Sequence, residues 1–284
     1  MPVSVAYAAV LVAALAHASW NALLKNSADR VLMLSAIRLV GLVAGIVAAA
    51  IAPLPSRESL PYLIGAAAIH YVYFALMIRS YRVGEMNQVY PIARGTAPLF
   101  VLLAGAWLAG EQFSELAVLA VGLVSAAILL LASGTTSSAK PRNRKAIVLA
   151  ICTGISIAGY SLLSGQGIRK SGSLLGYIAW LEISTGVGMV CFAATRNRQV
   201  LAEFAAMHWR SSLAAGILSV CGYAVALFAM SVAPIATVVA LRETSVVFAA
   251  CIGALFLGES FGGRRIAASI VVMAGLVLLA VASK

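Results

Sequence analysis

Charged residues are scarce in this sequence, and acidic residues are the scarcest of them. The chain of 284 residues has 9 Asp and Glu, 20 Lys and Arg, and a charged fraction of 10%. Soluble domains usually carry about 25% charged residues, and hydrophobic residues here reach 62%. The composition therefore excludes an ordinary soluble domain and favours a protein that lies in a membrane.

Cysteines are also few, and they lack the spacing that a metal site or a disulfide framework needs. Cys152, Cys191, Cys221 and Cys251 fall in apolar segments, without a Cys-x-x-Cys pair or a nearby histidine at ligand spacing. The apolar segments also lack a Ser–His–Asp arrangement, a metal triad and a phosphate-binding glycine loop. We expect no metal, no cofactor and no enzymatic activity.

Long apolar stretches fill most of the chain instead. A hydrocarbon core about 30 Å thick needs roughly 20 apolar residues per helix, and segments of that length follow one another. They lack the alternation over about ten residues that β-barrel strands show. We predict an all-α integral membrane protein with ten transmembrane helices, at residues 3–24, 31–52, 60–78, 86–109, 115–133, 146–166, 174–194, 211–230, 234–257 and 266–282.

One sequence pattern occurs twice. Arg94-Gly95-Thr96, Phe100 and Gly110-Glu111-Gln112-Phe113 recur, 148 positions later, as Arg242-Glu243-Thr244, Phe248 and Gly258-Glu259-Ser260-Phe261. A polar run of small residues at 134–145 separates two sets of five predicted helices, at 1–133 and 146–284. Because five is odd, the second set enters the membrane in the opposite orientation, which predicts two inverted-topology repeats.

The arginines of this repeat are expensive to bury. An arginine at the centre of a membrane helix costs roughly 2.5 to 3.5 kcal/mol on insertion scales. Arg94 and Arg242 are each the ninth residue of a predicted helix, so each lies about 12 Å from opposite membrane faces. Both are then close to the bilayer centre, where transporter sites are usually found.

Two prolines surround the first arginine. Pro91 and Pro98 cannot donate backbone hydrogen bonds, so we expect a kink near Arg94 and free carbonyls that face a wet cavity. The second copy has Val239 and Val246 at these positions. The site is therefore expected to be asymmetric.

The charged residues inside the predicted helices are three arginines and two glutamates, which leave one excess positive charge. They favour an anionic or zwitterionic solute, because an arginine fork binds a carboxylate or phosphate well. In the alternative interpretation, Arg38–Glu182 and Arg242–Glu243 are internal ion pairs. The predicted substrate-binding residues are Arg94, Arg242, Tyr90, Trp20, Asn21, Tyr73, Tyr160 and Tyr223, and the predicted proton-coupling residues are Glu243, Glu182 and His17.

The position of the basic residues predicts the topology. Of 20 Lys and Arg, 13 lie in odd-numbered connections, which places these connections in the cytoplasm and both termini outside. The cluster at 140–145 is then a lipid-facing topology signal, and nucleic acid is not an expected partner. The expected partners are a small-molecule substrate and membrane lipid, and a homodimer is left open.

The sequence resembles the EamA branch of the drug/metabolite transporter superfamily. The resemblance rests on the ten predicted helices, the two repeats, and a fourth helix of each repeat that ends in Gly-Glu (Gly110-Glu111 and Gly258-Glu259). The resemblance implies export of small metabolites, often driven by protons. Our leading hypothesis is a bacterial inner-membrane exporter of a small zwitterionic or anionic metabolite, such as an amino acid. The alternatives are a multidrug exporter of lipophilic cations and a flippase for lipid-linked sugars.

Overall fold

The computed structural model describes residues 3–27, 29–84, 86–108, 110–133, 143–256 and 263–282. Within these ranges the chain is helical throughout, apart from short connections, and contains no strand. Most of the predicted linker (134–142) and the second Gly-Glu, at Gly258 and Glu259, lie outside the described residues.

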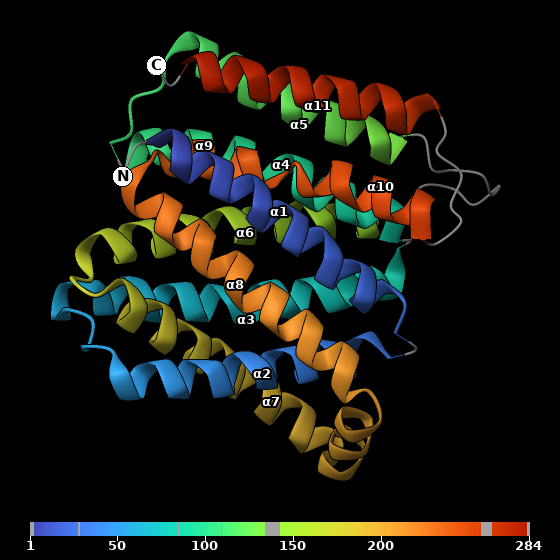
Figure 1. Ribbon diagram of the computed structural model, residues 1–284. Helices are drawn as coiled ribbons and strands as arrows, with labels where there is room; N and C mark the ends of the chain where they lie inside the picture. The colour runs from blue at the N-terminus through green and yellow to red at the C-terminus, as the bar shows by residue number, and fades with distance from the viewer. Residues whose placement is uncertain are drawn as a thin grey trace. The chain divides into compact units, whose positions relative to one another are not determined.

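Helices occupy every apolar segment that the sequence predicts, as Figure 1 shows. The chain enters α2 through Asp29, whose carboxylate accepts hydrogen bonds from the backbone N–H groups of Val31 and Leu32 at 2.8 and 3.0 Å. The first half contains α1 (Val3–Lys25), α2 (Arg30–Ile51), a short 3₁₀ turn η1 (Arg57–Ser59), α3 (Leu60–Val83), α4 (Met86–Leu108) and α5 (Glu115–Ser133).

The second half departs from the prediction in two places. The helix predicted at 174–194 continues to Met207. The segment predicted as a single helix at 234–257 consists of two helices that meet at Glu243 and Thr244. The helices of this half are α6 (Arg144–Lys170), α7 (Leu174–Met207), α8 (Trp209–Val232), α9 (Ile235–Arg242), α10 (Ser245–Phe256) and α11 (Gly263–Ala282).

Seven helical segments in the described part of the chain are long and apolar enough to cross a membrane. The interrupted α9 and α10 are too short to qualify singly, and α5 and α11 have shorter described apolar runs. This confirms the all-helical membrane class. The seven segments are Val5–Lys25, Arg30–Ile51, Arg57–Ser80, Val89–Trp107, Arg144–Lys170, Leu174–Thr195 and Trp209–Val232.

The chain forms two compact units, and each takes helices from both halves of the sequence. Unit 1 contains residues 1–71 and 163–232, and unit 2 contains residues 72–162 and 233–284. Helices α3 and α6 therefore contribute one end to each unit.

In unit 1, α2 packs along α7 and also against α8, while α1 packs against α8. Small residues allow the close approach of α2 and α7. A Cβ atom added at Gly45 would lie 2.8 Å from the backbone oxygen of Ala179, and one at Gly186 would lie 2.8 Å from the Cβ of Leu42. The spacing of Gly41 and Gly45 is typical of such a contact in membrane helices.

In unit 2, α5 packs against both α4 and α11, and α4 also contacts α9. Figure 1 shows α5 and α11 running side by side. Gly95 lies against the Leu129 side chain, and Gly275 against Val124, where an added Cβ atom would come within 2.9 and 2.6 Å respectively. The Gly95 contact holds α4, which carries Arg94, against α5, and the Gly275 contact holds α11 against α5.

Candidate functional site

Arg94 lies in the middle of α4, between the two prolines of that helix. Helix α4 continues through Pro91 and Pro98 without interruption. The Thr96 hydroxyl donates to the carbonyl oxygens of Ile92 and Ala93, at 2.8 and 3.3 Å. Serine and threonine make such bonds in helices, and they often bend the helix.

The opposing segment is broken where the sequence becomes polar. Helix α9 ends at Arg242, Glu243 and Thr244 form a turn, and α10 starts at Ser245. The backbone bonds of this turn connect residues three apart, from Glu243 N to the Ala240 carbonyl and from Thr244 N to the Leu241 carbonyl. The Thr244 hydroxyl also donates to the Leu241 carbonyl at 2.7 Å, which satisfies part of the free helix end.

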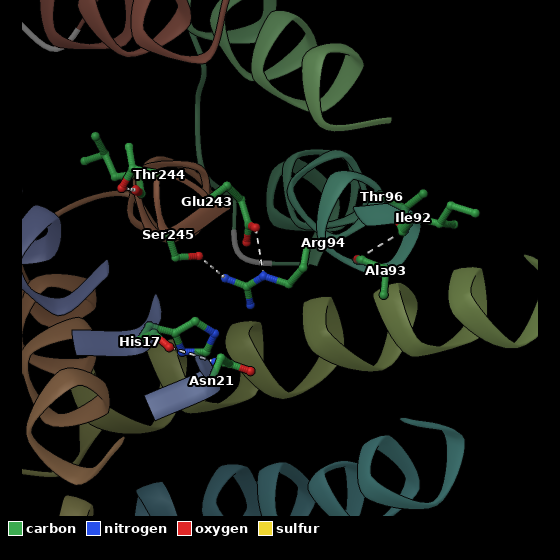
Figure 2. A network of polar contacts seen from close by, with 10 residues as sticks. His17, Asn21, Ile92, Ala93, Arg94, Thr96, Glu243, Thr244 and Ser245 are labelled. Carbon is green, nitrogen blue, oxygen red and sulfur yellow. Dashed lines mark hydrogen bonds and ion pairs between the residues drawn. The ribbon is translucent and has the colours of Figure 1, made fainter. Parts of the chain in front are cut away.

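This break places two side chains against Arg94. The Nε atom of Arg94 lies 2.9 Å from Oε2 of Glu243, and its Nη2 lies 3.4 Å from the Ser245 hydroxyl oxygen. The side chains of Arg94 and Glu243 are only 6% and 1% exposed. Figure 2 shows both partners turned toward the guanidinium group. We call Arg94, Glu243 and Ser245 the α4 cluster.

Further polar groups of unit 2 surround the α4 cluster. The hydroxyl groups of Tyr90, Tyr73 and Tyr160 interact electrostatically with the Arg94 guanidinium, and the rings of Tyr73 and Tyr160 meet edge to face at 5.6 Å. Arg242 is buried and interacts electrostatically with the Glu243 carboxylate. Five predicted substrate-binding residues and one predicted proton-coupling residue are therefore gathered in one place in unit 2.

Unit 1 contains a second buried cluster of the same composition. Arg38 of α2 donates through Nη1 to Oε2 of Glu182 in α7 at 3.2 Å, and through Nη2 to the Ser219 hydroxyl in α8 at 2.6 Å. We call these residues the α2 cluster. The internal Arg38–Glu182 pair that the sequence suggested is thus present.

The remaining predicted site residues also belong to unit 1. The rings of His17 and Trp20 meet at 5.1 Å, and the Asn21 amide donates along α1 to the His17 carbonyl at 2.8 Å (Figure 2). Tyr223 donates to the Ser164 hydroxyl at 3.1 Å, and its ring lies 5.9 Å from that of His70. These contacts are within unit 1.

Several of these partners were not predicted from the sequence. Ser219 and Ser245 were missed because serine is common in membrane helices. Glu243 was predicted as a proton-coupling residue, with an ion pair to the adjacent Arg242 as the alternative, and its pairing with Arg94 was not predicted. The available signal was the run Glu243-Thr244-Ser245, in which three polar residues interrupt an apolar segment. Such a run favours a break, since Thr and Ser hydroxyl groups compete for backbone bonds.

Comparison with solved structures shows which fold the chain shares. A solved structure titled only "Crystal structure of protein" superposes with a TM-score of 0.71 and 14% sequence identity, over 98% of this chain and 96% of the other. At this identity the match establishes a shared fold. No curated protein matches the sequence.

The sequence of the second half also matches a known family. Residues 144–281 match the model of the EamA-like transporter family. This match covers slightly less than half of the chain, and it supports the resemblance to EamA-type transporters of the drug/metabolite transporter superfamily. The apolar helices and this match together support a multi-pass membrane protein of the transporter type.

Proposed function

We propose that the protein is a proton-coupled secondary transporter that exports a small zwitterionic metabolite, an amino acid or a related compound, across the bacterial inner membrane. The α4 cluster binds the metabolite, and Glu243 carries the proton. We also propose ten transmembrane helices in two inverted repeats, with the basic odd-numbered connections in the cytoplasm and both termini outside. No step in this function requires a cofactor or an enzymatic reaction.

The buried ion pair between Arg94 and Glu243 carries this proposal. Two opposite charges at 2.9 Å, almost fully removed from solvent, would be costly to separate without replacement partners. A zwitterion supplies both replacements, because its carboxylate binds the Arg94 guanidinium and its ammonium group binds the Glu243 carboxylate. The Arg94–Glu243 ion pair is thus replaced by two ion pairs with the substrate, and neither side chain is left without a counter-charge.

The backbone around the pair supports an exchange of this kind. Glu243 lies in a turn between two helices, so its side chain can move without shifting a continuous helix. Arg242 provides a second positive charge beside it and is the proposed second anchor of the carboxylate. Tyr90, Tyr73 and Tyr160 supply hydroxyl groups for the rest of the solute. Trp20, Asn21, Tyr223, His17 and Glu182 remain predicted from the sequence as further site residues.

Proton coupling follows from the same exchange. A proton on Glu243 removes the partner of the ammonium group, so a proton and a zwitterion exclude one another. Mutual exclusion is the requirement for antiport, which allows an inward proton gradient to drive export. A purely anionic solute would behave oppositely, because it displaces Glu243 from Arg94 and leaves a carboxylate that needs a proton. The pH dependence of binding therefore distinguishes the two substrate classes.

The test is ligand-dependent thermal stabilisation of the purified protein, with a panel of amino acids, acetate, inorganic phosphate and tetraphenylphosphonium. A ligand at about 100 times its dissociation constant stabilises by about 2.7 kcal/mol. We expect stabilisation by one or more amino acids, and its loss in Arg94→Ala and Arg242→Ala. Both variants should still insert and fold.

Two outcomes would contradict the proposal. Full stabilisation of Arg94→Ala by the amino acid would show that Arg94 does not bind the substrate. Stabilisation by tetraphenylphosphonium alone, unchanged in both variants, would support the multidrug alternative. That alternative needs a free carboxylate for the cation, whereas Glu182 and Glu243 each face an arginine.

A further inference from the structure

Helix α9 is short and buried, and it begins without a capping side chain of its own. All eight of its residues, Ile235 to Arg242, are buried. The N-cap residue is Pro234, which provides no side-chain hydrogen bond. The first N–H groups of a helix lack intrahelical partners, and in a buried position they need partners from elsewhere.

Glu111 provides such a partner from a segment far away in the sequence. Its two carboxylate oxygens accept from the backbone N–H of Ile235, at 2.9 Å for Oε1 and 3.1 Å for Oε2. A carboxylate at this position is also attracted by the positive end of the helix dipole. Glu111 therefore caps α9 with both a hydrogen bond and a charge.

The turn after α4 fixes the position of Glu111. Gly110 has a φ of +62°, a left-handed conformation that other residues rarely adopt and that commonly ends helices. The backbone N–H of Glu111 then donates to the Gly105 carbonyl at 3.2 Å. The Gly-Glu pair thus connects the end of α4 to the start of α9.

The two helices that Glu111 connects carry, or lie directly beside, the two partners of the Arg94–Glu243 ion pair. Helix α4 carries Arg94, and α9 ends one residue before Glu243. If α9 slides or tilts, Glu243 moves relative to Arg94. We propose that Glu111 is a positioning residue, which holds α9 on α4 so that Glu243 stays paired with Arg94 in the absence of substrate. The consequence of this role for transport rests on the proposed function. Its effect on the Arg94–Glu243 ion pair can be tested without any substrate.

The test is labelling of Glu243 by dicyclohexylcarbodiimide in the purified protein, with the adduct quantified by mass spectrometry. Carbodiimides react with protonated carboxyl groups, and a carboxylate held in an ion pair is protected. We expect severalfold more adduct on Glu243 in Glu111→Ala than in the wild type. Glu111→Gln keeps an acceptor oxygen for the Ile235 N–H, so it should remain close to the wild type.

Three controls make each outcome decisive. Arg94→Ala removes the counter-charge and serves as the fully reactive reference. Glu115→Ala removes an exposed acid from the first turn of α5, near Glu111 in sequence, and should change nothing. Leu227→Ala removes a fully buried side chain of unit 1, so it lowers stability without touching α9.

The inference is overturned if Glu111→Ala protects Glu243 as well as the wild type does while Arg94→Ala is labelled. It is also overturned if Leu227→Ala raises the labelling as much as Glu111→Ala, because the effect would then be general loosening. Ligand stabilisation is measured separately with Arg94→Ala. A failed transport proposal and a failed positioning role therefore give different results.

Discussion

The α2 and α4 clusters contain the same three residue types in different backbone settings. Each has an arginine, a glutamate within ion-pair distance of it, and a serine hydroxyl that accepts from the guanidinium. In the α2 cluster the three residues lie on continuous helices, α2, α7 and α8. In the α4 cluster the arginine lies between two prolines, and its partners lie at and beside a helix break.

This difference shows that residue type alone does not define the role of a buried ion pair. Continuous helices packed through glycines cannot shift one side chain without disturbing the others, so the α2 cluster is suited to holding unit 1 together. A turn with three-residue hydrogen bonds has fewer backbone constraints. The α4 cluster is therefore the one suited to exchange its partners with a substrate.

The largest expected effect on stability comes from removing one partner of the ion pair in the α2 cluster. Arg38→Met should cost about 3 to 5 kcal/mol, because it leaves the buried Glu182 carboxylate without a counter-charge. The double variant Arg38→Met/Glu182→Leu should recover most of this stability. Thermal unfolding in detergent measures both.

The same pair of substitutions in the α4 cluster sharpens the comparison. Arg94→Met/Glu243→Leu should likewise recover stability relative to Arg94→Met, yet show no stabilisation by any amino acid of the panel. If the α2 double variant instead lost ligand stabilisation and the α4 double variant kept it, the roles assigned to the clusters would be reversed.

A smaller effect is expected at Gly41, which makes room for the α2 cluster. An added Cβ atom would lie 2.5 Å from Oε2 of Glu182, so Gly41→Ala should destabilise by about 1 to 3 kcal/mol through overpacking. Gly122→Ala in α5 is the matched control, since nothing lies within 4 Å of its added Cβ atom. Equal unfolding temperatures for both variants would show that Glu182 is not tightly held.

The smallest effect on stability is expected at the helix break. Thr244→Val removes the hydroxyl bond to the Leu241 carbonyl and should cost about 0.5 to 1.5 kcal/mol. Thr185→Val in the continuous α7 removes a similar bond to Leu181 and should cost a similar amount. Only Thr244→Val should weaken ligand stabilisation. An identical ligand response of the two variants would argue against a role of the break in binding.

The sequence was sufficient to predict most of the fold. Apolar segments of about twenty residues identified the helices, because the thickness of the bilayer dictates their length. The position of the helix break at Glu243 and Thr244 was harder to predict from the sequence. Prolines suggested an irregularity near Arg94, but α4 stays helical through both of them, and the break lies in the copy that has no proline.

In the candidate site, the buried arginines were predictable from the sequence, and their pairing was less so. Arg94, Arg242 and Arg38 could be identified from the sequence because an arginine inside an apolar helix needs a partner. The partner of Arg94 was not visible, since Glu243 reaches it only through the packing of α4 against α9. Glu111 illustrates the same point, because its cap on Ile235 depends on a contact between segments 124 residues apart.

The pH dependence of amino-acid binding tests whether Glu243 exchanges a proton for the ammonium group. The amino acid that stabilises the wild type most is titrated over a pH range in which it keeps both charges. Glu182→Gln is measured in parallel, because Glu182 is the other carboxyl predicted to couple protons. We predict that its stabilising effect falls as the pH is lowered in the wild type and in Glu182→Gln. In Glu243→Gln it should be weak and independent of pH. A pH dependence that survives in Glu243→Gln, or binding that strengthens as the pH falls, would contradict a zwitterion held between Arg94 and Glu243.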